Sequence, residues 1–320
     1  MFSLSQYTAA RTSAVMIDRS ALGTIALTGA DRRTFMHGLL TNDIAGLTPG
    51  KGTYAAYLTP QGRMISDMRV IETGSRILLG VEREVADGLA RRLDSLIFSE
   101  DVQVVDVSRE IEMIGVHGPS APVLTQRATG LPVDTLANQY DNVTSGNVTI
   151  VRDDALALAG FDIHLPSAEA HVLREKLSDG GAVTASAETY ETLRIEAGRP
   201  RFGLDMTTDT IPLEAGIEDR AISFTKGCYV GQEVIVRVTH RGHGRVARRL
   251  VSIVLPAGRV PGPGDAICAG DRQVGAITSA TESPKLGSAL ALGYVQRDYA
   301  AAGTALTVNG SQARVHQPVD

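Results

Sequence analysis

The sequence predicts an α+β protein with two mixed lobes that ends in a small β-barrel. Before residue 200, strand-like runs alternate with single helices, and no long βαβ series of a doubly wound sheet is present. After Arg249, short strand-like runs are separated by turn sequences rich in Gly, Pro, Asn and Asp, as in a barrel of about 75 residues. The chain contains neither a GxGxxG motif nor a P-loop, so no motif supports a nucleotide-binding fold.

The first lobe is expected to combine five strands with two helices. The strand-like runs are residues 24–27, 54–58, 64–71, 76–81 and 102–107. Thr28 is a candidate cap for a helix that runs toward Leu40. Apolar residues at near-helical spacing, from Val85 to Leu96, predict a second, amphipathic helix over residues 82–98.

The second lobe is expected over about residues 110–195, and the barrel after it. Ser167 and Ser186 are candidate helix caps, and the dipeptide Asn309-Gly310 between two strand-like runs is a hairpin signal. We expect a boundary near residues 242–250. This divides the chain into a two-lobed region of residues 1–241 and a barrel of residues 242–320.

Composition excludes several classes of function. Of the 320 residues, 43% are apolar and 21% charged, which is typical of a soluble globular protein. The net charge of −5, the absence of Trp and an aromatic share of 4% argue against a general nucleic-acid-binding surface. No run is apolar enough to span a membrane, and the start lacks the features of a secretion signal. With only two Cys, neither in a disulfide framework, we expect a cytoplasmic protein.

Cys228 lies in the segment that holds the most candidate reactive residues. Gly227 and Gly231 flank it, and Lys226 precedes it by two residues. A nearby cation and a helix that begins near Gly231 would both favour the thiolate. Most free Cys are simply small buried apolar residues, and Cys268, in a strand-like run of the barrel, fits that description. On its Gly-flanked polar loop, Cys228 is better interpreted as a functional residue.

Residues 240–249 form a compact basic segment. The simpler interpretation is a solvated linker between domains, and the alternative is a contact with an anionic tail or an RNA backbone. No aromatic residues interleave with the charges, which favours the linker. His240 and His243 are three apart but have no Cys or carboxylate close by in sequence, so no metal site is predicted.

Carboxylates offer another kind of site, because a buried Asp or Glu can bind the amino-pyrimidinone edge of a pterin through paired hydrogen bonds. Asp67 follows a Gly turn on a predicted strand, and Asp162 lies within another. Arg194, in a predicted helix, could meet a carboxylate. Taken singly, each has an ordinary structural explanation as a capping residue or a surface ion pair.

Residues 226–233, together with Arg237, resemble the signature of the YgfZ group of folate-binding proteins. This group is related to the glycine-cleavage T-protein, an aminomethyltransferase. Other segments resemble the two groups in the expected order, namely residues 37–43, 58–67, 193–198, 212–216, 274–279 and 283–284. The resemblance therefore extends over nearly the whole chain.

The resemblance implies a three-lobed fold that binds tetrahydrofolate or a one-carbon derivative of it. By position, Asp162 corresponds to the pterin-binding Glu of the T-protein, and Arg194 to an Arg of its Leu-Arg-Leu-Glu-Ala-Gly helix. Where the T-protein has two adjacent Asp, one of them catalytic, this chain has Ser66 and Asp67. From the signature, Tyr229, Gln232 and Arg237 are assigned to cofactor binding.

Two functions follow as hypotheses, and the Cys228 signature together with the missing Asp pair favours the first. In the first, the protein is an accessory factor that assembles or repairs iron–sulfur clusters, including those of tRNA-modifying radical-SAM enzymes. Its partners would be iron–sulfur client proteins or assembly factors, and its reactive groups Cys228 and Lys226. In the second, it is a folate-dependent aminomethyl or methyl transferase that acts on a small amine through Asp67. Direct RNA contact is the least favoured alternative, and no membrane partner is expected.

Overall fold

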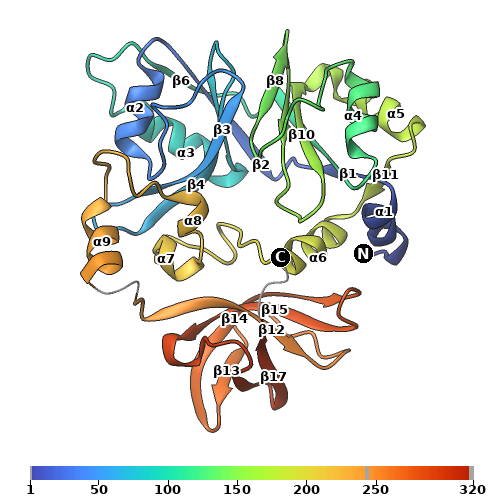
Figure 1. Cartoon of the computed structure of the whole chain (residues 1–320), viewed down its shortest axis with the longest axis vertical. Coiled ribbons are helices and arrows are strands. Elements are labelled where there is room, and N and C mark those ends of the chain that lie inside the picture. Colours follow the sequence, from blue (N-terminus) through green and yellow to red (C-terminus); the bar gives the residue numbers. More distant parts are fainter. Residues whose placement is uncertain (1, 242–244, 317–320) are drawn as a thin grey trace. The chain divides into compact units, whose positions relative to one another are not determined.

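The computed structural model describes residues 2–241 and 245–316, which form two compact units (Figure 1). The first comprises Met1–Leu58, Ser66–Thr189 and Arg220–Val230. The second comprises Thr59–Ile65, Tyr190–Asp219 and Gly231–Asp320. Each unit is therefore assembled from segments that are distant in the sequence.

A five-stranded sheet forms one half of the first unit, with strand order β3-β4-β5-β2-β6. The strands are β2 (Leu22–Thr28), β3 (Lys51–Leu58), β4 (Met64–Glu72), β5 (Ile77–Glu82) and β6 (Gln103–Asp106). Two helices accompany this sheet, α2 (Arg32–Leu39) and α3 (Arg83–Asp94) (Figure 1). All five predicted strand runs are thus found. Most of their ends lie within two residues of the predicted positions, and β3 begins three residues earlier than predicted.

A six-stranded sheet forms the other half, with strand order β11-β1-β7-β10-β9-β8. Its strands are β1 (Val15–Asp18), β7 (Ile111–His117), β8 (Asn142–Ser145), β9 (Val148–Arg152), β10 (Gly160–Pro166) and β11 (Val183–Ala185). The accompanying helices are α1 (Leu4–Thr12), α4 (Ala121–Thr129), the short η1 (Ser167–Glu169) and α5 (Ala170–Asp179).

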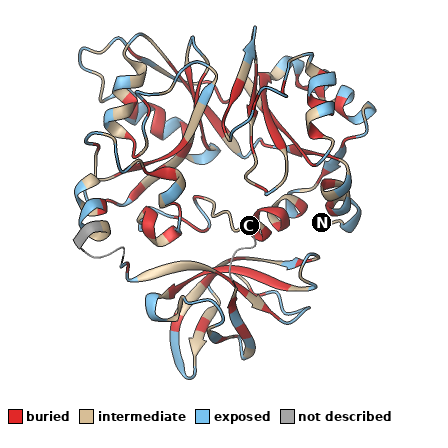
Figure 2. Ribbon diagram, viewed as in Figure 1, coloured by how far each residue is buried: buried red, intermediate tan, exposed pale blue. Residues whose placement is uncertain are grey.

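The two faces of β10 have different chemistry, as strand alternation dictates. Phe161, Ile163 and Leu165 belong to an apolar core that also contains residues of α4 and α5. Asp162 and His164 alternate with them and are buried as well. Figure 2 shows that much of the first unit's strand ribbon is coloured as buried. The second face of the sheet therefore carries buried polar groups in place of an apolar core.

The second unit contains a closed six-stranded barrel, as the sequence predicted, with strand order β12-β15-β14-β13-β16-β17. The strands are β12 (Arg248–Leu255), β13 (Ala266–Ala269), β14 (Arg272–Ser283), β15 (Ser288–Gln296), β16 (Ala305–Val308) and β17 (Ser311–His316), with the short η3 (Arg297–Tyr299). Asn309 and Gly310 join β16 to β17 with φ of 50° and 74°, the positive values that a tight hairpin turn requires. The predicted Asn-Gly hairpin is confirmed.

The remaining helices lie between the lobes and the barrel in sequence. They are α6 (Ala187–Glu196), α7 (Pro212–Ala215), α8 (Glu218–Ala221), α9 (Gln232–Val236) and the π-helical turn η2 (Arg237–Arg241). Ser186 caps α6, because its Oγ accepts a hydrogen bond from the Thr189 N–H at 3.2 Å. Within the described residues, no helix is both long and apolar enough to cross a membrane.

Four local expectations need correction or fall outside the described residues. Ser167 caps no α-helix: it opens η1, its Oγ donates to the Arg109 carbonyl, and Glu169 is the N-cap residue of α5. Thr28 ends β2 and caps no helix, and Asp31 is the N-cap residue of α2. The helix expected over residues 82–98 ends at Asp94, where a turn replaces its last residues. Of the basic segment, residues 242–244, which include His243, lie outside the described residues.

Candidate functional site

Asp67 forms a hydrogen-bonded pair with Tyr54 on the adjacent strand. The Tyr54 hydroxyl donates to Asp67 Oδ2 at 2.5 Å, and the Asp67 side chain remains partly accessible. Burial raises the pKa of Tyr54 well above 10, and the neighbouring Asp67 charge raises it further. The phenol therefore stays protonated as a permanent donor, which fixes the orientation of the carboxyl group.

Burial also raises the pKa of Asp67 above its ordinary value. The Tyr54 hydrogen bond and the charge of Arg69 oppose this effect. The guanidinium of Arg220 lies 5.1 Å from the centroid of the Tyr54 ring and adds a second cation to the neighbourhood. Asp67 is thus a carboxyl group whose ionisation its surroundings control, as expected of a functional acid or base.

Asp162 lies in a separate cluster, where it shares Arg19 with Asp153. Arg19 Nη2 is 3.4 Å from Asp162 Oδ2 and 3.5 Å from Asp153 Oδ2, and all three side chains are at most 3% exposed. Burial opposes ionisation of both carboxyl groups. Arg69 and Arg19 outweigh burial at Asp153 and lower its pKa, whereas at Asp162 burial prevails and the pKa is raised. Of the two carboxyl groups, Asp162 is therefore the last to lose its proton as the pH rises.

His117 completes this cluster. Its Nε2 lies 3.9 Å from Asp162 Oδ1, and burial lowers the pKa of His117 to about 4. Within the described residues, neither ring nitrogen of His117 nor Asp162 Oδ1 has a hydrogen-bond partner. Such buried polar atoms call for a partner, and a bound polar group or water would supply one.

Ligand atoms of His117, Asp153 and Asp162 all lie within 4.8 Å of one another, the spacing of a metal site. Arg19 already supplies a positive charge to both carboxyl groups, however, and Arg69 Nη2 lies 3.8 Å from Asp153 Oδ2. Two guanidinium groups balance two carboxylates, so a divalent cation would add uncompensated buried charge. The cluster is better described as an arginine-neutralised carboxyl pair.

Arg194 takes part in a buried network of the second unit. Its guanidinium donates to Asp205 Oδ2 at 2.7 Å, to Glu191 Oε2 at 2.8 Å, to the Arg199 carbonyl and to Ser279 Oγ. The side chain is 3% exposed. The protein itself therefore satisfies the guanidinium that was expected to meet a ligand carboxylate.

Lys226 binds the end of helix α2. Its Nζ donates to the carbonyls of His37, Leu40 and Asn42 at 2.5, 2.7 and 3.1 Å. It also lies 5.1 Å from the centroid of the Tyr229 ring. Burial lowers the pKa of Lys226 to about 8, and nearby Asp43 opposes this effect. A cation at the C-terminal end of a helix is favourable, and all three ammonium protons are used there.

Cys228 is exposed on the same loop, and Tyr229 beside it is buried. Burial raises the pKa of the Tyr229 hydroxyl to about 12. Gln232 and Arg237 belong to the second unit, where Gln232 opens α9 after Gly231 and Arg237 is exposed. The structure thus places Lys226, Cys228 and Tyr229 in one unit, and Gln232, Arg237 and Arg194 in the other.

Sequence reasoning missed Tyr54, Arg19, Arg69, His117 and Asp153. A signal existed for Arg69, because strand alternation places it on the same face as Asp67, two residues earlier. Arg19 and Asp153 are separated by 134 residues, and their proximity depends on the pairing of strands within the sheet. No local pattern indicates that pairing.

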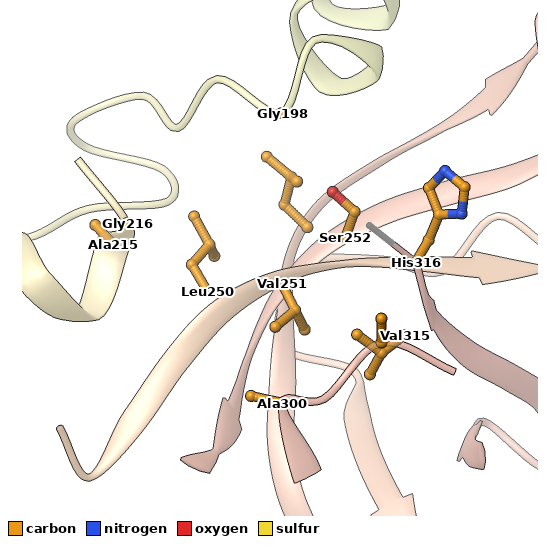
Figure 3. A pocket seen from close by; sticks show the side chains of 11 residues that line it. Gly198, Ala215, Gly216, Leu250, Val251, Ser252, Ala300, Val315 and His316 are labelled. Atoms are coloured by element: carbon orange, nitrogen blue, oxygen red, sulfur yellow. The ribbon is translucent and has the colours of Figure 1, made fainter. Parts of the chain in front are cut away.

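A cavity of about 240 Å³ occurs in the second unit. Figure 3 shows side chains of β12 and β17 in its wall, and residues near Gly198, Gly216 and Ala300 also line it. Ser252 and His316 are its polar members. None of the residues expected to bind folate lines this cavity.

Comparison with known proteins places this architecture in a family. Residues 2–226 match the family described as the GCVT N-terminal domain, and residues 248–319 match the glycine cleavage T-protein C-terminal barrel domain. The crystal structure of the glycine cleavage system aminomethyltransferase T from Bartonella henselae aligns with a TM-score of 0.90 at 23% identity. It covers 98% of this chain and 88% of that chain, and it shows the same fold.

Curated relatives carry one name. An aminomethyltransferase of Rubrobacter xylanophilus is 29% identical over 91% of this chain and 78% of its own length. One of Bacillus subtilis is 27% identical over 95% of this chain and 85% of its own length. Aminomethyltransferases of this family use tetrahydrofolate, the cofactor expected from the sequence. Because the first family model alone covers more than half of the residues, the chain belongs to the GCVT N-terminal domain family, and its barrel is that of the glycine cleavage T-protein.

Proposed function

We propose that this protein binds tetrahydrofolate and acts as a folate-dependent aminomethyl or methyl transferase on a small amine, with Asp67 at its reactive centre. The Tyr54–Asp67 pair is the observation that carries the proposal. Asp67 is partly accessible and held in one orientation, whereas Asp162 is 1% exposed and already engaged by Arg19. Among the predicted carboxylates, Asp67 is the one a substrate can reach.

The residues of the first unit fit a folate in part. Asp67 offers a carboxylate acceptor, and Asp162 Oδ1 is a buried acceptor without a partner among the described residues. An amino-pyrimidinone edge presents N–H donors that match such acceptors. Arg194 does not fit the role of anchor for a ligand carboxylate, since Asp205 and Glu191 already bind it. Asp162, Tyr229, Gln232 and Arg237 remain proposed cofactor-binding residues.

In this proposal tetrahydrofolate accepts the one-carbon unit, and the chain supplies position and charge. The Asp67 carboxylate would accept a hydrogen bond from the protonated amine of the substrate and hold it in place. Tyr54 would keep the carboxylate oriented. Arg69 and Arg220 would favour its ionised form against the effect of burial.

A second candidate function rests on Cys228. The thiol is exposed, and Lys226 fixes its loop to the end of α2 through three hydrogen bonds. This presentation, together with the resemblance to the YgfZ group, supports an accessory role in iron–sulfur cluster assembly or repair in the cytoplasm. The partners would be client proteins or assembly factors, including radical-SAM enzymes that modify tRNA. For either function, we propose that residues 1–241 form the folate-binding region and residues 242–320 the barrel domain.

An assay for 5,10-methylene-tetrahydrofolate formed from candidate methylamines decides between the two functions. We expect Asp67→Asn to abolish turnover and Cys228→Ala to retain it. An Asp209→Asn variant, which changes an exposed carboxylate paired with Arg63, is the matched control. No turnover by the wild-type protein, together with loss of cluster-enzyme rescue in Cys228→Ala alone, would instead support the accessory role.

A further inference from the structure

We propose that Arg69 is a positioning residue that links Asp67 on one sheet of the first unit to the Asp153–Asp162 pair on the other. The inference rests on the proposed role of Asp67. The two carboxyl clusters form a single electrostatic unit, in which the Arg69 guanidinium influences the ionisation of both.

The backbone of β4 aims Arg69 at the opposite sheet. Arg69 follows Asp67 by two residues, so both side chains lie on one face of the strand, while Met68 and Val70 are buried on the other face. Arg69 pairs with Gly80 on β5. A Cβ built at Gly80 would lie 3.6 Å from Arg69 Cβ and 3.9 Å from Met113 Cε of β7. The side chain of Arg69 thus passes over a glycine toward the six-stranded sheet.

The guanidinium ends beside Asp153. Arg69 Nη2 lies 3.8 Å from Asp153 Oδ2, the same oxygen that Arg19 Nη2 approaches at 3.5 Å. The second carboxyl group, Asp162, lies 3.4 Å from that Arg19 nitrogen. Arg69 therefore approaches the pair directly only at Asp153 Oδ2. Its effect on Asp162 is indirect, because Arg19 lies near both that oxygen and Asp162.

The charge of Arg69 acts on both Asp67 and Asp153. Its charge lowers the pKa of Asp67 against burial, and it is the strongest cationic influence on Asp153. Other titratable groups that feel the same charge are Tyr140, His117, His164 and Asp162. A charge at this point favours the ionised forms of Asp67 and Asp153, so Asp162 is the last of the pair to lose its proton as the pH rises.

Carboxyl titration by NMR tests the link directly. Protein labelled with ¹³C at the Asp carboxyl carbons would be assigned with Asp67→Asn, Asp153→Asn and Asp162→Asn. In Arg69→Met, the titrations of Asp67 and Asp153 should both move to higher pH, each by roughly one unit. Arg69→Lys keeps the charge and should shift both by less. It also keeps the test open if the methionine variant does not fold.

Arg91→Met, which removes an exposed guanidinium on α3, is the matched control and should leave both titrations unchanged. A shift confined to one of the two carboxyl groups, or to neither, would overturn the link. A merely structural role for Arg69 would lower stability without moving the two titrations together.

A second measurement separates this inference from the proposed function. Tetrahydrofolate affinity, measured by calorimetry at pH 7, should fall at least tenfold in Arg69→Met and change little in Arg91→Met. If the titrations shift but affinity does not, Arg69 does not position the site. If the wild-type protein binds no tetrahydrofolate, the proposed function fails, while the titrations still decide whether Arg69 links the two clusters.

Discussion

Gly160 and His117 occupy the same small space at the start of β10. A Cβ at Gly160 would lie 2.1 Å from Nδ1 of His117 and 2.5 Å from the Asp153 carbonyl oxygen. The imidazole of His117 is completely buried and thus depends on the absence of a side chain at residue 160. A glycine on one strand therefore makes room for the polar cluster of Asp153 and Asp162.

This relationship predicts a large effect for a small change. Gly160→Ala should lower the free energy of unfolding by roughly 2–4 kcal/mol, because the new methyl group has no free volume and would displace buried polar atoms. Urea denaturation measures the loss. Gly38→Ala, on helix α2, is the control: nothing lies within 4 Å of its Cβ position, and the change should be neutral or stabilise by up to about 1 kcal/mol. Equal stability of the two variants would contradict the account.

Stability should depend on the protonation of His117. Its folded pKa of about 4 is below the ordinary value of 6.5, so between these values the unfolded chain binds more protons and acidification favours unfolding. The contribution of His117 amounts to about 3 kcal/mol lost from pH 7 to pH 4. Asp162, whose pKa is raised, acts in the opposite direction over the lower part of this range.

The comparison of wild type with His117→Asn isolates this contribution. The variant should show a shallower fall in unfolding free energy between pH 7 and pH 4, even if its stability at pH 7 is lower. His171→Asn changes an exposed histidine on α5 and should keep the wild-type slope. Parallel curves for wild type and His117→Asn would show that His117 is not buried as a neutral imidazole.

Arg194 should contribute mainly to stability. Arg194→Met leaves Asp205 as a buried carboxylate without its ion-pair partner, which typically costs about 3–5 kcal/mol. Arg63→Met breaks an exposed pair with Asp209 and should change stability by less than about 1 kcal/mol. Thermal unfolding would reveal the difference. An Arg194→Met protein of wild-type stability that has lost folate affinity would return Arg194 to the role of ligand anchor.

Lys226 should hold its loop in place. Without the ammonium, the carbonyls of His37, Leu40 and Asn42 lose their donor. In Lys226→Met we therefore expect faster amide hydrogen exchange in residues 38–44 and 223–230. Lys226→Arg should not restore protection, because a planar guanidinium cannot converge on three carbonyls as an ammonium does. Lys51→Met, which removes a more exposed lysine paired with Asp141, is the control.

The same variants distinguish a holding role from thiol activation. All three Nζ protons of Lys226 are directed at carbonyls, so alkylation of the exposed Cys228 at neutral pH should change by less than about threefold in Lys226→Met. Unchanged hydrogen exchange together with a tenfold slower alkylation would support thiol activation instead.

The elements were largely accessible from sequence because each has a local cause. Alternating apolar residues predict β4 and β10, and Asn309-Gly310 can adopt the positive φ that its hairpin needs. The end of α3 at Asp94 was not accessible, since apolar spacing continues to Leu96 after the helix stops. Residues beyond a helix can remain apolar because they still pack against the fold.

The site was less accessible, because its partners come from distant segments. Asp67 and Asp162 could be selected as carboxylates on strands, but their environments depend on Arg69, Arg19 and Tyr54. Lys226 illustrates the same limit: sequence places it two residues from Cys228, whereas the fold directs its ammonium to helix α2, which lies 187 or more residues earlier in sequence. The proximity of Lys226 to Cys228 in sequence did not indicate which groups the Lys226 ammonium contacts.

Calorimetric titration with tetrahydrofolate tests the central claim, that Asp67 lies at a folate site. We expect one-to-one binding to the wild-type protein, affinity at least tenfold weaker in Asp67→Asn, and wild-type affinity in the control Asp209→Asn. Asp67→Asn keeps the size of the side chain, so the Tyr54 contact can persist while the charge is lost. Equal affinity of wild type and Asp67→Asn, or no binding by the wild-type protein, would contradict the claim.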